Sequence, residues 1–221
     1  MSAYFVTATG TDIGKTYVSA ALLRAFREAG EKVSALKPIV SGFPGPDPAR
    51  SDPGVLLTAM AKSPDEAAIN AISPWRFSEP LSPDMAAARE GRTIPFDELV
   101  AFCRRRIVAH EGLLLVEGVG GVMVPIDDVH TVRDWIVELG IPVLLVAGGY
   151  LGTISHTLTA LDALASVGLR PHAVIVNDCG GAPVPLEETV ATIARFAPHM
   201  PIVSMARDGD ISALTALLRP L

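Results

Sequence analysis

The stretch Val6-Thr7-Ala8-Thr9-Gly10-Thr11-Asp12-Ile13-Gly14-Lys15-Thr16 decides the fold of this chain. It follows a strand-like run, Tyr4-Phe5-Val6, and precedes apolar residues at helical spacing from Val18 to Ala29. A glycine such as Gly14 lets the backbone approach a ligand closely. Backbone N–H groups at the start of a helix, together with the helix dipole, attract an anionic oxygen. The stretch therefore predicts a phosphate-binding loop.

Two side chains at the end of this loop carry chemistry. Lys15 adds a mobile positive charge, and the Thr16 hydroxyl can ligate a Mg²⁺ ion held between phosphates. The usual pattern of Gly, four residues and Gly-Lys-Ser/Thr is not matched in full, because position 9 is Thr. The alternative is an ordinary glycine turn with Lys15 in solvent, and it leaves the Gly-Lys-Thr run unexplained.

Length and composition indicate one domain spanning residues 1–221, with hydrophobic residues making up 49% of the chain. No apolar run approaches the ~20 residues of a membrane span, and no signal peptide is evident, so the expected compartment is the cytoplasm and no membrane partner is expected. Cys103 and Cys179 lack Cys-x-x-Cys spacing and are predicted to be structural thiols. The net charge of −6 argues against nucleic-acid binding, and Arg104-Arg105-Arg106 is interpreted as a solvated helix face.

Apolar strands alternate with amphipathic helices along the whole chain. Strands are predicted around residues 4–6, 32–38, 113–117, 142–147, 173–177 and 201–205, and helices around residues 18–29, 95–110, 129–139, 186–196 and 211–218, with a further helix after residue 153. Strands that are apolar on both faces are typical of parallel sheets. The fold class is therefore α/β, a single-domain P-loop NTPase-like fold with a mainly parallel sheet and helices on both faces.

Polar residues stand where three of these strands end. Lys37 ends the second strand, Glu117 ends the run Leu113–Val116, and Asn177 ends a later strand. Ligands of open parallel sheets collect at the carboxyl ends of strands, so these groups are expected over one crevice. Other interpretations remain open: Lys37 as a surface lysine, Glu117 as the partner of a structural lysine, and Asn177 as a turn residue.

Two proline-rich segments interrupt the pattern. Residues 41–54 form a long loop in which Asp52 precedes Pro53, as expected of a helix cap, and the same carboxylate could contact Mg²⁺. Residues 74–84 cannot form one regular helix and are interpreted as a covering segment with Trp75 and Phe77 packed beneath it.

The chain resembles the dethiobiotin synthetases nearly from end to end. The shared motifs are Tyr4-Phe5-Val6-Thr7 with Gly14-Lys15-Thr16, Lys37-Pro38 with Ser41-Gly42, Ser51-Asp52, Phe77-Ser78-Glu79-Pro80-Leu81-Ser82-Pro83, Val116-Glu117-Gly118-Val119-Gly120-Gly121, Leu151-Gly152 before His156, and Val176-Asn177-Asp178. The phosphate loop is common to many nucleotide hydrolases. Lys37 with Ser41 and the Glu-Gly-x-Gly-Gly turn is far more specific.

This resemblance implies a homodimeric ligase with its substrate site near the interface. It would join 7,8-diaminononanoate (7,8-diaminopelargonate) and CO₂ in a cyclic urea, using ATP and Mg²⁺. By the same resemblance, the expected residues are Lys15 and Lys37 for catalysis; Asp12, Ile13, Gly14, Lys15, Thr16, Tyr17, Glu117 and Asn177 for ATP; Thr16, Asp52 and Glu117 for Mg²⁺; and Ser41, Gly120 and Leu151 for the diamine. Asn177 is expected to contact adenine.

Three positions depart from the family pattern. Asp12 stands where a longer Glu is common, Ser155 replaces a frequent Asn, and Ser204-Met205-Ala206 lacks the usual proline of the adenine-side loop. These departures weaken the expected contacts to the diamine, to its carboxylate and to adenine respectively.

The main alternative is a switch ATPase of the partitioning or cell-division type (ParA/MinD-like). Such proteins carry an extra lysine early in the phosphate loop, whereas residues 7–11 contain none. They also use a basic surface or an amphipathic terminal helix, and residues 211–221 contain a single Arg. An amide-forming ligase on a cofactor precursor would need a glutamine-hydrolysing domain, for which 221 residues leave no room.

Overall fold

The computed structural model describes residues 2–43, 47–207 and 211–218. In chain order the elements are β1 (Ser2–Ala8), α1 (Lys15–Glu28), β2 (Val33–Leu36), β3 (Ile39–Ser41), the 3₁₀ turn η1 (Pro48–Arg50), α2 (Asp52–Ala59), α3 (Glu66–Ile72), β4 (Trp75–Phe77), α4 (Pro83–Arg89), α5 (Phe96–Ala109), β5 (Leu113–Glu117), α6 (Val132–Leu139), β6 (Val143–Gly148), α7 (Thr153–Ala165), β7 (Ala173–Asn177), α8 (Leu186–Phe196), β8 (Ile202–Met205) and α9 (Ser212–Leu218).

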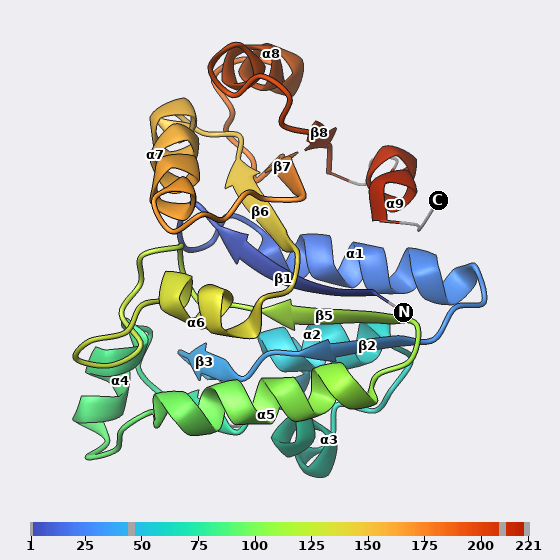
Figure 1. The fold of residues 1–221 in the computed structure, drawn as a ribbon. Coiled ribbons are helices and arrows are strands. Elements are labelled where there is room, and N and C mark those ends of the chain that lie inside the picture. Colours follow the sequence, from blue (N-terminus) through green and yellow to red (C-terminus); the bar gives the residue numbers. More distant parts are fainter. Residues whose placement is uncertain (1, 44–46, 208–210, 219–221) are drawn as a thin grey trace.

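Six parallel strands form the central sheet in the order β2-β5-β1-β6-β7-β8. Figure 1 shows the strands between two layers of helices. Buried residues of α1, α2 and α9 pack on the face that carries Tyr4 and Val6, and residues of α5, α6, α7 and α8 pack on the face that carries Phe5. The predicted α/β fold is therefore confirmed. Among the described residues, no helix combines the length and apolar character needed to cross a bilayer.

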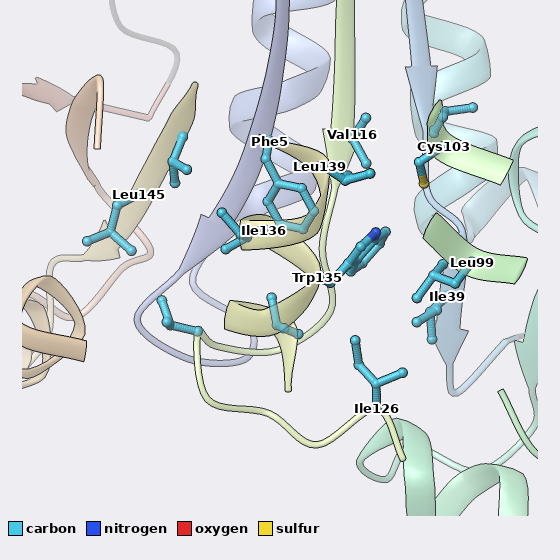
Figure 2. Packing of buried hydrophobic residues seen from close by; sticks show 14 of the residues in the cluster. Phe5, Ile39, Leu99, Cys103, Val116, Ile126, Trp135, Ile136, Leu139 and Leu145 are labelled. Atoms are coloured by element: carbon cyan, nitrogen blue, oxygen red, sulfur yellow. The ribbon is translucent and has the colours of Figure 1, made fainter. Parts of the chain in front are cut away.

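The second of these layers is packed around Trp135 of α6, which has no exposed surface (Figure 2). Its ring meets Phe5 of β1 edge to face, with ring centroids 4.8 Å apart. Cys103 of α5 lies in the same layer, and burial raises the pKa of its thiol to about 12. A thiol held in its protonated form is unreactive, so Cys103 is a packing residue, as predicted.

A second, two-stranded parallel sheet joins β3 to β4 and was not anticipated from the sequence. Ile39 pairs with Trp75 and Ser41 with Phe77. The pairing brings the proline-rich segment 74–84 alongside the strand that carries Ser41. Phe77 is buried, as predicted for a residue beneath a covering segment. Strands of this length show too few alternations for a periodic pattern to reveal them.

Two helix starts differ from the prediction. Helix α1 begins at Lys15 rather than Val18, because Gly14 takes a left-handed backbone conformation (φ 97°) that ends the loop directly before it. The prediction that Asp52 caps α2 is wrong, since Ser51 is the cap and its Oγ accepts a hydrogen bond from the Gly54 N–H at 3.2 Å. The Asp52 carboxylate is therefore not used in capping.

Candidate active site

The order of the strands brings Lys37 next to Glu117. Leu36 of β2 is paired with Val116 of β5, so the residues that follow each of them are neighbours at the carboxyl edge of the sheet. On the other side of β5, Glu117 is paired with Val6 of β1, and the phosphate loop begins directly after β1. Sheet order thus collects the loop, the lysine and the carboxylate at one edge.

Lys37 joins two carboxylates in this site. Its Nζ lies 2.8 Å from Glu117 Oε1 and 3.1 Å from Asp52 Oδ2, and it also donates to the Gly118 carbonyl at 2.8 Å. The Thr16 hydroxyl donates to the same Glu117 oxygen at 2.6 Å. Lys37 therefore bridges two of the residues expected to ligate Mg²⁺, Asp52 and Glu117, and the third, Thr16, is held by Glu117.

The charges of this network support one another. Burial acts to lower the pKa of Lys37, but the Glu117 and Asp52 carboxylates outweigh it and raise that pKa above its usual value. Burial acts in the opposite direction on Asp52, and the Lys37 charge outweighs it and lowers the pKa of that carboxyl. Lys37 is therefore an ammonium and Asp52 a carboxylate at neutral pH.

Lys15 has a different environment. Its Nζ donates to the carbonyls of Gly10, at 3.1 Å, and Gly120, at 2.8 Å, and it forms no ion pair with any described residue. Burial, together with the nearby Lys37 charge, lowers its pKa to about 8. An anion bound at the loop would relieve both effects, since it would supply the missing counter-charge. This is the electrostatic state expected of a phosphate-binding lysine.

A cavity of about 810 Å³ opens above these groups, and this volume suits a ligand of ordinary cofactor size. Several predicted residues line it: Asp12, Gly14, Lys15, Thr16, Lys37, Ser41, Asp52 and Gly120. The buried Ser41 Oγ has no hydrogen-bond partner among residues 2–43, 47–207 and 211–218, so it is available to a ligand. Glu117 has no exposed surface and contacts the lining residues Lys37 and Thr16.

Four predicted residues lie away from this cavity. Leu151 is 86% exposed, and Tyr17 is half-buried against the core of the α1 face. Ile13 is buried and lines a smaller adjacent hollow of about 440 Å³. Asn177 is buried, and its side chain contacts the phosphate loop.

The sequence interpretation missed part of the cavity wall. The segment Pro80-Leu81-Ser82-Pro83 and Met85 of α4 line the cavity opposite the phosphate loop, together with Val40 of β3. The proline-rich composition of residues 74–84 did indicate a cover. It gave no indication of what the segment covers, because that depends on the β3–β4 pairing.

The donor set fits a magnesium ion that is bound mainly through a nucleotide. Thr16, Asp52 and Glu117 offer oxygen atoms only, and the buried Glu117 Oε2 has no hydrogen-bond partner among the residues that the structure describes. Within the described part of the chain, no group of three or more His, Cys, Asp or Glu side chains is placed so that it could hold a metal ion. Mg²⁺ commonly takes one or two carboxylates and completes its shell with phosphate and water, so these residues suffice.

Comparison with known proteins gives close relatives. A family model described as an AAA domain matches residues 2–208. The chain is 55% identical over 202 residues to "ATP-dependent dethiobiotin synthetase BioD" of Acidiphilium cryptum, covering 91% of each chain. It is 45% identical over 218 residues to the protein of the same name from Methylobacterium nodulans, covering 96% of each.

Among solved structures, a ParA family ATPase from Chlorobium tepidum superposes with a TM-score of 0.56. The match covers 98% of this chain and 90% of that one, at 13% sequence identity. Such a likeness shows a shared P-loop NTPase fold and does not extend to function.

Proposed function

We propose, starting from the fact that this chain belongs to the AAA-domain family and within it to the ATP-dependent dethiobiotin synthetases, that it closes the ureido ring of dethiobiotin. The substrates would be 7,8-diaminononanoate, CO₂ and ATP, and the other products ADP and phosphate. The observation that carries this proposal is the contact of Lys37 with Glu117 and Asp52 beside the phosphate loop, on one cavity.

The reaction has three bond-forming steps. One amine of the diamine captures CO₂ as a carbamate. A carbamate oxygen then attacks the γ-phosphorus of ATP, which releases ADP and leaves a carbamic-phosphoric mixed anhydride. The second amine attacks the carbonyl carbon of that anhydride, and phosphate leaves as the urea ring closes.

Lys15 and Lys37 would stabilise the charge that moves in the second step. Negative charge passes from the carbamate oxygens to the transferred phosphoryl oxygens, and preorganised cations at both places lower its energy. Thr16, Asp52 and Glu117 would hold Mg²⁺, which supplies further positive charge to the phosphate oxygens. Asp12, Ile13, Gly14 and Tyr17 belong to the loop and first helical turn on which the nucleotide phosphates would lie.

The diamine would lie in the part of the cavity that faces β3 and the 74–84 segment. Ser41 Oγ is buried and has no partner in the described part of the chain, and it would donate to the carbamate end. The side chains of Val40, Leu81 and Val124 would contact the hydrocarbon chain. The substrate carboxylate would then lie near Gly120 and the Leu151 turn of a second copy in a homodimer.

Product formation tests this function directly. ADP release is measured with MgATP and bicarbonate, with and without 7,8-diaminononanoate, while the product is followed by mass. We expect ADP release that depends on the diamine, and a product heavier than it by one carbonyl and lighter by two hydrogens. If DNA or lipid instead stimulates ATP hydrolysis in the absence of the diamine, that result would favour the switch ATPase. The relatives at 45–55% identity are named dethiobiotin synthetases and do not support that function.

A further inference from the structure

Asn177 connects the end of strand β7 to the phosphate loop. Its Nδ2 donates a hydrogen bond to the Ile13 carbonyl at 2.9 Å, across 164 positions of the chain. The backbone of Asn177 is fixed on both sides, since it is paired with Gly148 of β6 and Met205 of β8. The residue is 2% exposed, so solvent does not compete for this bond.

The partner of the amide settles its orientation. The Ile13 carbonyl can only accept, so the NH₂ group must face the loop and Oδ1 must face away from it. Oδ1 is buried and has no hydrogen-bond partner among the described residues, which leaves one acceptor for a donor outside the protein. The exocyclic amino group of a nucleobase is such a donor.

The phosphate loop lies so close to the Asn177 amide that position 14 has no space for a side chain. A Cβ atom at position 14 would come within 2.2 Å of Asn177 Nδ2. Gly14 therefore serves two purposes: it adopts the left-handed conformation that begins α1, and it leaves space for the amide.

The side chains of Lys15 and Asn177 both donate to carbonyls of the loop between residues 9 and 14, Lys15 to Gly10 and Asn177 to Ile13. Lys15 would turn toward the phosphates when a nucleotide binds, and its hydrogen bond to the Gly10 carbonyl would then be lost. The hydrogen bond from Asn177 to the Ile13 carbonyl does not compete with the ligand, so it would persist.

We infer that Asn177 is a positioning residue for the phosphate loop, so that it contributes to phosphate binding even when no base is present. The inference rests on the proposed function, in which a nucleoside triphosphate occupies this loop. A residue that only read the base would leave the affinity for a triphosphate without a base unchanged. The two roles are therefore separable by the choice of ligand.

The experiment compares inorganic triphosphate with ATP, each with Mg²⁺, by isothermal titration calorimetry. We expect Asn177→Ala to weaken both ligands, with triphosphate binding falling about tenfold, the effect of losing one well-formed buried hydrogen bond. Asn70→Ala is the matched control, because that amide is exposed and accepts a hydrogen bond from Arg76 on the surface. The control should bind both ligands as the wild type does.

Asn177→Asp is a second variant that keeps the shape of the side chain and an acceptor for the base, while it removes the N–H donor. Deuterium exchange of residues 10–16 should rise in both variants, while exchange of residues 143–148 of β6 should stay unchanged. A general loss of stability would raise exchange in both regions. If the affinity for triphosphate is unchanged while the affinity for ATP falls, the inference is overturned. A wild-type protein that binds neither ligand would instead overturn the proposed function.

Discussion

At the scale of single residues, the site depends on a buried ion pair whose members need each other. Glu117 has no exposed surface, and Lys37 is 2% exposed. Each charge would be costly to bury alone, and the pair is tolerated because both charges are matched and hydrogen-bonded. Besides its proposed role in catalysis, Lys37 therefore also stabilises the folded site.

We expect Lys37→Gln to abolish product formation and to lower the free energy of unfolding by about 3–5 kcal/mol, because Glu117 would lose its counter-charge. Added Mg²⁺ should raise the melting temperature of the variant more than that of the wild type, since a second cation can neutralise the carboxylates. Thermal unfolding with and without Mg²⁺ measures this.

Lys32→Gln is the control for this variant, because Lys32 is exposed and pairs with Glu111 at the surface. It should leave activity and the Mg²⁺ response unchanged. A Lys37→Gln protein with normal stability and full product formation would contradict both roles assigned to Lys37.

Gly14 provides a second test at this scale. We expect Gly14→Ala to abolish nucleotide binding, because the residue has φ 97° and its new methyl group would meet the Asn177 amide. Gly30→Ala is a matched control, with φ 84° and no atom within 4 Å of the added Cβ. The control should lose about 1–2 kcal/mol from its left-handed conformation and should still bind ATP in calorimetry. Equal loss of binding in both variants would show that backbone strain alone explains the effect.

At the scale of elements, the start of α2 could not be predicted from the sequence alone. Asp52 and Pro53 satisfied the sequence rule for a helix cap, but Ser51 satisfies it as well and is the residue with extended dihedrals. The choice left the Asp52 carboxylate available to Lys37. A local rule could not decide between two adjacent capping residues.

Helix α6 has an acidic group that can be tested by pH. Asp134 Oδ2 accepts hydrogen bonds from the Thr131 N–H, at 2.7 Å, and from the Thr131 hydroxyl, at 2.6 Å. Burial acts to raise the pKa of Asp134, but these bonds outweigh it and lower that pKa. A carboxyl whose pKa is lower in the folded than in the unfolded protein stabilises the fold at pH values above its unfolded pKa of about 4. This stabilisation is lost as the pH falls through the folded pKa.

We expect Asp134→Ala to lower the free energy of unfolding by about 1 kcal/mol at pH 7, the usual value of a capping interaction. The difference from the wild type should shrink as the pH falls below about 4, because protonated Asp134 no longer accepts both bonds. Urea unfolding of both proteins across this range measures the difference. A difference that is independent of pH would show that packing, and not the carboxylate, is responsible.

At the scale of the whole molecule, the family resemblance predicts a homodimer. Leu151 lies in the turn before α7 and is 86% exposed, although the family resemblance places it at a substrate carboxylate. A second copy that covers this turn would account for both facts. Single exposed apolar residues are common, so exposure alone does not decide the matter.

We expect Leu151→Glu to shift the protein toward monomers in sedimentation and to raise the KM for the diamine, because a charge would be buried at the interface. Val108→Glu is the control, since Val108 is 87% exposed at the end of α5, away from the Leu151 turn. Wild-type sedimentation of the Leu151→Glu protein would remove this turn from the interface.

The amino-acid sequence by itself determined the fold class, the phosphate loop and the polar residues at strand ends. Each of these follows from a local pattern: apolar periodicity, the Gly-Lys-Thr run, or a carboxylate after four apolar residues. Such patterns persist whatever the rest of the chain does, so they can be recognised one segment at a time.

Only the tertiary structure decided which of these groups meet. Lys37 and Glu117 are 80 positions apart, and Asn177 and Ile13 are 164 apart. Their contacts follow from the strand order β2-β5-β1-β6-β7, which the chain adopts because both faces of the sheet must be buried under helices. The covering segment lies beside Ser41 through the β3–β4 pairing, which forms a separate sheet. Burial of the whole sheet is a property of all its segments together, and no single segment specifies its neighbour.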